Sequence, residues 1–286
     1  MILGWMGTPA EVLSQSVSYF RYYFLGAPFV VMYNIFVGIL HAVGDSMHPL
    51  YYLIFSAFLN VLLDLLFVTV FHWGVGAAAI ATTISQGVST VLCCIHLYRV
   101  DAPYKLRFRE IRFHKKTLLD IIRFGFPSAV QNSVIAIANV VVQSNINSFG
   151  KEAMAGCGAY SKLEGFAFMP ITCFTQALST FVGQNLGAKQ YDRVKKGVGF
   201  GIVCSCIGAE LVGLVCYLLA PKLIGFFNSE PVVIDFGVRH MRTICLFYFL
   251  LAFSHCIAGI MRGAGKASVP MVTMLVFWCL VRVSYI

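Results

Sequence analysis

Long apolar stretches with few polar interruptions dominate this chain of 286 residues. Runs of roughly 18 or more residues with almost no internal charge are typical of membrane-spanning helices, because lipid leaves every backbone group to be satisfied within the segment. The runs cover residues 22–44, 50–71, 74–98, 124–150, 165–187, 197–220, 243–262 and 267–286. The pattern predicts an all-α polytopic membrane protein with about eight transmembrane helices.

The composition agrees with a membrane protein and changes how the cysteines are interpreted. Hydrophobic residues make up 59% of the chain and charged residues 12%, against about 25% charged in soluble domains. Nearly all of the ten cysteines lie inside the apolar runs, where they are interpreted as small hydrophobic side chains. The histidines are scattered singly, and no Cys or His spacing typical of a metal site is present.

The net charge of +9 is distributed unevenly between the loops. Thirteen Lys and Arg residues lie in or beside loops 44–49, 99–116, 187–196 and 263–267, and only three lie in the alternate loops. Because cytoplasmic loops of membrane proteins carry the excess of basic residues, we expect these four loops to be cytoplasmic. The same rule explains the basicity without a nucleic-acid partner. We expect a multi-pass protein of the plasma membrane, the inner membrane of a bacterium.

An internal repeat links two distant segments. The pattern G-I-x-x-x-x-G-x-x-x-x-P occurs at Gly38–Pro49 and again at Gly259–Pro270, an offset of 221 residues. Glycine can end a helix and proline can begin the next. Six predicted spans separate the copies, so both cross the membrane in the same direction, as in transporters with parallel repeats.

The repeat predicts two pseudo-symmetric lobes of six helices each. Residues 1–110 would then be the last part of a first lobe, and residues 111–286 an incomplete second lobe. On this interpretation the chain is a fragment of a twelve-helix protein of roughly 450 residues. The alternative is a complete eight-helix protein in which two hairpins resemble each other locally.

Polar side chains inside a predicted span are expensive in lipid and are therefore candidates for function. Asp64 lies near the middle of the run 50–71, and Asn60 lies four residues earlier on the same helical face. The next run supplies Thr82 at a comparable depth in an antiparallel hairpin. These oxygen ligands suit Na⁺, and a desolvated carboxyl group also takes up protons. Alternatively, Asp64 only hydrogen-bonds a neighbouring helix.

Other polar groups are candidates for the wall of a substrate cavity. The run 124–150 carries several amides and no charge, including Gln131, Asn132 and Asn139, which indicates a polar lumen or a seam between helices. Glu164 is placed near the outer end of its span, within the first turns, where it either forms an ion pair or faces the lumen. No metal site is predicted apart from Na⁺ at Asp64.

Three segments resemble the MATE family, the multidrug and toxic compound extrusion transporters. FVGQNLGAKQYDRVKKG at 181–197 is similar to the loop signature after the family's eighth helix. GIMRGAGKASVP and its counterpart GILHAVGDSMHP are similar to a paired element of the two lobes, and WGVGAAAIATTISQ at 73–86 resembles the sixth helix. The resemblance covers essentially the whole chain, as helices four to eleven of twelve.

The resemblance implies a secondary active transporter. Such proteins exchange drug-like, often cationic compounds for Na⁺ or H⁺ by alternating access. In the DinF-like branch the first-lobe cation site uses positions that match Asn60, Asp64 and Thr82, together with an Asp of the first helix, which lies outside this chain. The other branch has carboxylates where runs 124–150 and 243–262 have none. We therefore expect the chain to belong to the DinF-like branch and to need no cofactor besides the coupling ion. The expected partners are the lipid bilayer and small-molecule substrates, and the full-length protein is expected to be a monomer.

Three other functions are weighed against transport of drugs. A flippase for lipid-linked precursors, of the same superfamily, would need several cationic side chains in its lumen for a pyrophosphate. A membrane enzyme would need an embedded nucleophile and base, an acidic metal-binding cluster or an HExxH motif, and none is present. The composition also agrees with a passive channel. Only an antiporter moves its substrate against a concentration gradient at the expense of an ion gradient, so that measurement distinguishes the two.

Overall fold

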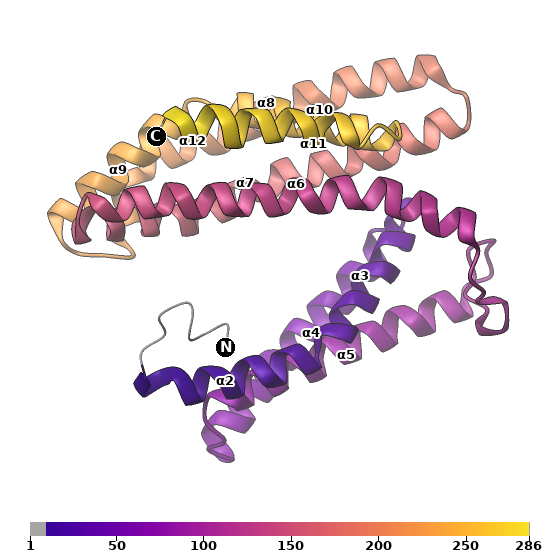
Figure 1. The fold of residues 1–286 in the computed structure, drawn as a ribbon, viewed down its shortest axis with the longest axis horizontal. Helices are drawn as coiled ribbons and strands as arrows, with labels where there is room; N and C mark the ends of the chain where they lie inside the picture. The colour runs from indigo at the N-terminus through magenta and orange to yellow at the C-terminus, as the bar shows by residue number, and fades with distance from the viewer. Residues whose placement is uncertain (1–9, 286) are drawn as a thin grey trace. The chain divides into compact units, whose positions relative to one another are not determined.

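The computed structural model describes residues 10–285, which are helical almost throughout (Figure 1). Two compact units follow each other along the chain, Met1–Arg112 and Phe113–Ile286. Large apolar side chains such as Ile54, Phe58 and Phe200 are exposed on the helices, as expected for surfaces that contact lipid. All ten cysteines are free thiols.

In the first unit α5 is the helix against which the others pack. The elements are α2 (Ala10–Leu25), α3 (Ala27–Ala42), α4 (Met47–Leu65), the π-helix η1 (Leu66–Val70), α5 (Val75–Arg99) and the short 3₁₀ helix η2 (Phe108–Glu110). A buried cluster joins Phe36 and Leu40 of α3 to Cys93 and Leu97 of α5. The α4–η1 segment and α5 form the antiparallel hairpin that carries the polar residues predicted above.

In the second unit α7 is central and packs against α8, α9 and α10. The elements are α6 (Lys115–Ser148), α7 (Lys151–Gly187), α8 (Tyr191–Gly225), α9 (Pro231–Cys245), α10 (Tyr248–Gly263), α11 (Ser268–Met274), the π-helix η3 (Leu275–Val281) and α12 (Arg282–Tyr285). Small residues allow close approach: Gly259 of α10 lies directly against the backbone oxygen of Thr175 on α7. The segment α11–α12 runs along α6 (Figure 1).

The predicted repeat is present in the backbone. Helices α3 and α4 begin 221 residues before α10 and α11. In both copies a bend precedes the first helix, by 43° before α3 and by 55° before α10. Gly44 and Gly265 end the helices with φ of 86° and 77°, in the left-handed region that suits glycine.

The two turns also share their hydrogen bonds. The Gly44 and Asp45 N–H groups donate to His41 and Leu40 at 3.0 and 2.9 Å. The equivalent Gly265 and Lys266 N–H groups donate to Arg262 and Met261 at 2.9 and 2.8 Å. This pair of bonds is the Schellman arrangement, which satisfies the last carbonyls of a helix.

The count of spans differs slightly from the prediction. Among residues 10–285, five helices are long and apolar enough to cross a membrane, and seven if each bent pair counts as one span. The eighth predicted run, 267–286, is helical over Ser268–Tyr285, but its apolar helix Ser268–Cys279 is shorter than the others. A π-helix interrupts this last segment, which changes the direction of its side chains.

Candidate cation site and polar groups inside the helices

A polar stripe on α4 faces α5 inside the first unit. Ser56, Asn60 and Asp64 are spaced four residues apart, which puts them on one helical face. The Ser56 hydroxyl donates to the Ser85 backbone oxygen at 2.6 Å, and both residues are buried. The α4–α5 interface is therefore polar where most helix contacts in a membrane protein are apolar.

Asn60 and Thr82 meet across this interface. The Asn60 Nδ2 group donates to Thr82 Oγ1 at 3.4 Å, and the Thr82 hydroxyl donates to the Ala78 backbone oxygen at 2.9 Å. The Thr82 proton is thus directed back into its own helix, and its oxygen lone pairs face the α4 side chains. The structure brings together two of the three predicted cation ligands.

Asp64 lies one helical turn beyond Asn60 on α4. Its Oδ1 atom is buried and has no hydrogen-bond partner among the residues that the structure describes. On α5, Gln86 Oε1 and Ser85 Oγ are also buried and have no hydrogen-bond partner among the described residues. A buried oxygen without a donor is costly, especially on a carboxylate. These acceptors need a cation, a proton or water to be satisfied.

The backbone near Asp64 is irregular. The α-helix ends at Leu65, and the next five residues, Leu66–Val70, form the π-helix η1. Single π-helical turns inside longer helices occur frequently at functional sites, because they re-aim side chains and loosen the regular hydrogen-bond ladder. The candidate carboxylate therefore lies directly before a break in helical periodicity.

Glu164 lies deeper in its helix than predicted. Because α7 begins at Lys151, Glu164 is well inside a helix of 37 residues, and its placement in the first turns was wrong. The Tyr160 hydroxyl donates to Glu164 Oε1 at 3.1 Å and lies 3.3 Å from the Tyr248 hydroxyl of α10. The carboxylate thus belongs to a network that joins α7 to α10.

Arg282 connects this network to α6. Its Nη1 donates to Asn139 Oδ1 at 3.0 Å, and its positive charge also interacts with Glu164. The guanidinium lies over the Trp278 ring, 4.5 Å from the centroid. Asn139 and Glu164 are therefore grouped around one cation.

The other two candidate cavity residues on α6 are Gln131 and Asn132, and they do not contact Arg282 in any hydrogen bond of the described residues. Gln131 is buried and its Oε1 has no partner among the described residues, whereas the Asn132 side chain is exposed. The four cavity candidates therefore do not form a single cluster.

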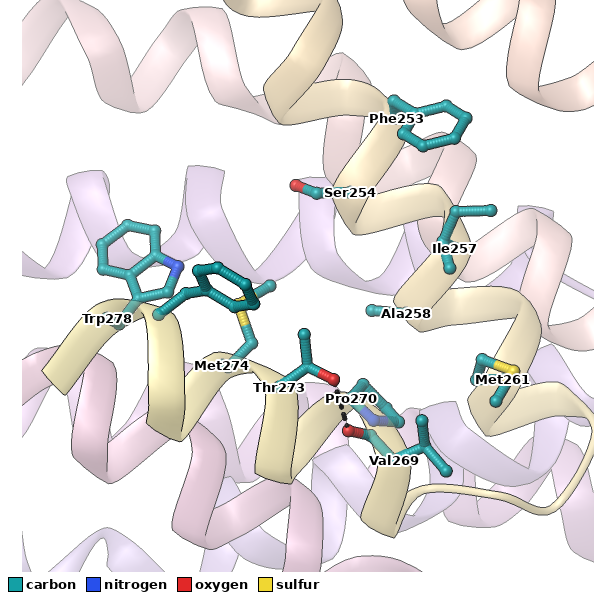
Figure 2. A pocket seen from close by; sticks show the side chains of 11 residues that line it. Phe253, Ser254, Ile257, Ala258, Met261, Val269, Pro270, Thr273, Met274 and Trp278 are labelled. Atoms are coloured by element: carbon teal, nitrogen blue, oxygen red, sulfur yellow. Dashed lines mark hydrogen bonds between the residues drawn. The ribbon is translucent and has the colours of Figure 1, made fainter. Parts of the chain in front are cut away.

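An apolar cavity of about 360 Å³ lies between α10 and the segment α11–η3 (Figure 2). Figure 2 shows Ser254, Ile257 and Ala258 of α10 opposite Thr273 and Met274. The Ser254 and Thr273 hydroxyls donate to backbone oxygens of their own helices, so they offer little hydrogen bonding to a guest. Trp278, which lies under the Arg282 guanidinium, also lines the cavity.

Several polar residues of these networks escaped the sequence reasoning. Tyr160 and Tyr248 were not predicted, although Tyr160 lies four residues before Glu164, the spacing of a same-face pair. Glu210 of α8 is a charged residue outside these networks, and its Oε2 accepts the Phe249 N–H at 3.2 Å, in the first turn of α10 after the bend.

Comparison with known proteins identifies relatives of this chain. The family model described as MatE matches residues 1–66 and 127–285. Two proteins of Bacillus subtilis, named probable multidrug resistance proteins YpnP and YoeA, are each 27% identical. The alignments cover 98% and 97% of this chain but 63% and 62% of those proteins, so this chain spans less than two thirds of their length.

Solved structures give the same picture of the fold. The crystal structure of MATE in the bent conformation superimposes with a TM-score of 0.91 at 22% identity. The match covers 99% of this chain and 63% of that one. At this level of identity the likeness establishes the fold, an all-helical membrane protein.

Proposed function

This chain belongs to the MatE family, and from that premise we propose that the whole protein is a secondary active efflux transporter. The family consists of transporters and not of enzymes. The proposed reaction exports drug-like, often cationic compounds in exchange for Na⁺ or H⁺ by alternating access. The ion drives the change only through its different affinities for the outward- and inward-facing states.

Within that transporter, residues 1–110 form the last part of the first lobe, and residues 111–286 belong to the second. The division of the structure after Arg112 and the repeated hairpin support this assignment. Loops 44–49, 99–116, 187–196 and 263–267 face the cytoplasm of a bacterial cell and carry the excess of basic residues. The transporter acts as a monomer in the plasma membrane.

The observation that carries the proposal is the buried, unpartnered Oδ1 of Asp64 beside the Asn60–Thr82 pair. Carboxylate, amide and hydroxyl oxygens are hard ligands that suit Na⁺. A proton on the carboxyl group would satisfy the same atom. Asp64 is the charged ligand, while Asn60 and Thr82 position each other as the neutral wall of the site. On this proposal the chain belongs to the DinF-like branch, and the match of Asn60, Asp64 and Thr82 to that branch supports it.

The second unit supplies polar and apolar surfaces for a substrate. Glu164 and Asn139 offer a carboxylate and an amide near Arg282, and the ring of Trp278 connects this group to the apolar cavity. A carboxylate attracts a cationic group, and an apolar cavity accepts an aromatic or aliphatic body. Gln131 and Asn132 complete the set of proposed cavity residues on α6.

Efflux of ethidium from cells that express the whole gene tests the assignment of Asp64. Asp64→Asn keeps the size of the side chain and removes its charge, so we expect ion-dependent efflux to fall by about tenfold or more. Asp235→Asn is the matched control, because Asp235 is exposed and, among the described residues, forms its ion pair with Arg239 at 2.8 Å. It should leave efflux within about twofold of the unaltered protein.

Two gradients identify the coupling ion. Efflux is measured with a Na⁺ gradient at equal pH, and then with a pH gradient without Na⁺. We expect one of the two to drive efflux and Asp64→Asn to abolish that response. Efflux by Asp64→Asn that is undiminished and still ion-dependent, at equal membrane expression, would contradict the assignment.

A further inference from the structure

Three potential metal ligands meet where the α3–α4 turn lies against the end of α5. Asp45 belongs to the turn, His48 to the first turn of α4 and His96 to the last turn of α5. His48 Nδ1 lies 2.7 Å from Asp45 Oδ2, and His96 Nε2 lies 3.6 Å from the same oxygen. One ligand atom from each residue falls within 4.8 Å of the others. The sequence concealed this cluster, because His96 is far from the other two along the chain.

The spacing of these atoms fits a tetrahedral ion. Zinc–nitrogen and zinc–oxygen bonds of about 2.0–2.2 Å place two ligand atoms of a tetrahedron about 3.3 Å apart. The two measured separations, 2.7 and 3.6 Å, lie on either side of that value. Small changes of side-chain torsion are therefore enough to close the three ligands around one ion.

Outer hydrogen bonds already orient two of the ligands. The Tyr52 hydroxyl lies 3.2 Å from His96 Nδ1, which leaves His96 Nε2 directed at Asp45. The His48 backbone N–H donates to Asp45 Oδ1 at 3.2 Å, which leaves Oδ2 as the ligand atom. Partners of this kind fix the ring and the carboxylate in metal sites, and removing one typically weakens binding about 10- to 100-fold.

Charge and access also suit a metal ion. Asp45 is the acidic side chain among the three ligands, and the two imidazoles supply neutral nitrogen atoms. The Asp45 and His96 side chains are 20% and 16% exposed, while His48 is 49% exposed and leaves a path for the ion.

The simpler explanation is that Asp45 and His48 only stabilise the turn. The repeated turn between α10 and α11 argues against that need, because Lys266 and Val269 occupy the equivalent positions and form the same backbone hydrogen bonds. The turn therefore folds without a carboxylate or an imidazole. Something other than the turn accounts for the Asp45–His48–His96 arrangement.

We propose that Asp45, His48 and His96 bind a first-row divalent metal ion, preferentially Zn²⁺, with water in the fourth position. Two imidazoles and a carboxylate are ligands that zinc accepts. To bind the ion, His48 Nδ1 must be the acceptor nitrogen, so the neutral ring carries its proton on Nε2 and no net proton is released. The ion joins the α3–α4 turn to the last turn of α5 and acts as a clamp on this end of the first unit.

Metal binding is measured on the purified protein in detergent. Any polyhistidine tag is removed and the thiols are alkylated with N-ethylmaleimide, because the ten cysteines are also potential ligands. Zn²⁺ is titrated against a chromophoric chelator. We expect the unaltered protein to bind one Zn²⁺ ion per chain. The zinc affinity should fall by about 100-fold or more in His96→Gln and in the double variant Asp45→Lys/His48→Val. The double variant copies the α10–α11 turn and is therefore expected to fold.

His41→Gln is the matched control, since His41 lies in the last turn of α3 outside the cluster and should leave binding unchanged. Tyr52→Phe should weaken binding about tenfold. Co²⁺ bound to the alkylated protein provides a second measurement, with the absorption bands of a tetrahedral nitrogen and oxygen site. Equal zinc binding by the unaltered protein and both cluster variants would overturn the proposal, as would an octahedral Co²⁺ spectrum or the absence of bound metal.

Discussion

The hairpins α3–α4 and α10–α11 share the geometry of their bend and turn and differ in chemistry. Both begin after a bend, end their first helix at a glycine with positive φ and close the turn with the same pair of hydrogen bonds. In the first copy Asp45 and Asp64 provide charged groups. At the equivalent positions, 221 residues later, the second copy has Lys266 and Tyr285, and Tyr285 is 91% exposed.

Residues common to both hairpins shape the turn, and residues present in one hairpin are candidates for binding an ion. A turn glycine and a proline five residues later are common to both copies, and they suffice to specify the turn. The Asn60–Asp64 pair and His48 are replaced in the second copy by Val281, Tyr285 and Val269. Polar residues that the backbone does not require are the better candidates for function.

The largest change in the free energy of unfolding is expected at the glycine that is repeated inside the first helix of each hairpin. A Cβ at Gly259 would lie 2.5 Å from the Thr175 backbone oxygen, whereas a Cβ at Gly38 would meet nothing within 4 Å. We expect Gly259→Ala to destabilise the protein by about 1–3 kcal/mol. Gly38→Ala should be neutral or stabilise it by up to about 1 kcal/mol. Thermal unfolding in detergent, followed by tryptophan fluorescence, measures both, and equal losses would contradict the difference in packing.

The turn glycines should instead behave alike. Gly44→Ala and Gly265→Ala each force a residue with a Cβ into the left-handed region, at a cost of about 1–2 kcal/mol. The same unfolding measurement applies. A loss confined to one of the two variants would show that the turns are not equivalent.

The smallest effect concerns the hydrogen bond that only the first copy can form. Thr82→Val removes the acceptor of the Asn60 amide, and interhelical bonds in membranes contribute about 0.6 kcal/mol on average. Thr273→Val is the control, because its hydroxyl donates to the Val269 backbone oxygen of its own helix. The unfolding midpoint should fall further for Thr82→Val than for the control. An equal fall would mean that the Asn60–Thr82 bond adds no stability.

The sequence predicted those features that depend on local pattern or on a short hairpin. Apolar runs gave the helices, and Gly44 and Gly265 gave the turns. Asp64 and Thr82 were expected at a comparable depth because two consecutive helices must pack as neighbours. The hydrogen bond of Thr82 is with Asn60, one turn before Asp64 on α4.

Features that depend on long-range packing were missed. Glu164 was placed too close to a helix end, because hydropathy does not detect the polar first part of α7, which begins at Lys151. The link between Arg282 and Asn139 joins α12 to α6, and no pattern in the sequence indicates it. The same holds for the meeting of His48 with His96, whose ring centroids lie 4.1 Å apart.

On the proposed function, the coupling ion binds at the Asp64 carboxylate. Infrared difference spectroscopy of the purified protein, on adding Na⁺ at constant pH or on lowering the pH, reports the state of buried carboxyl groups directly. We predict a carboxyl difference band that responds to one of these ions, disappears in Asp64→Asn and persists in Asp235→Asn. A band of equal size in the unaltered protein and in Asp64→Asn would contradict ion binding at Asp64.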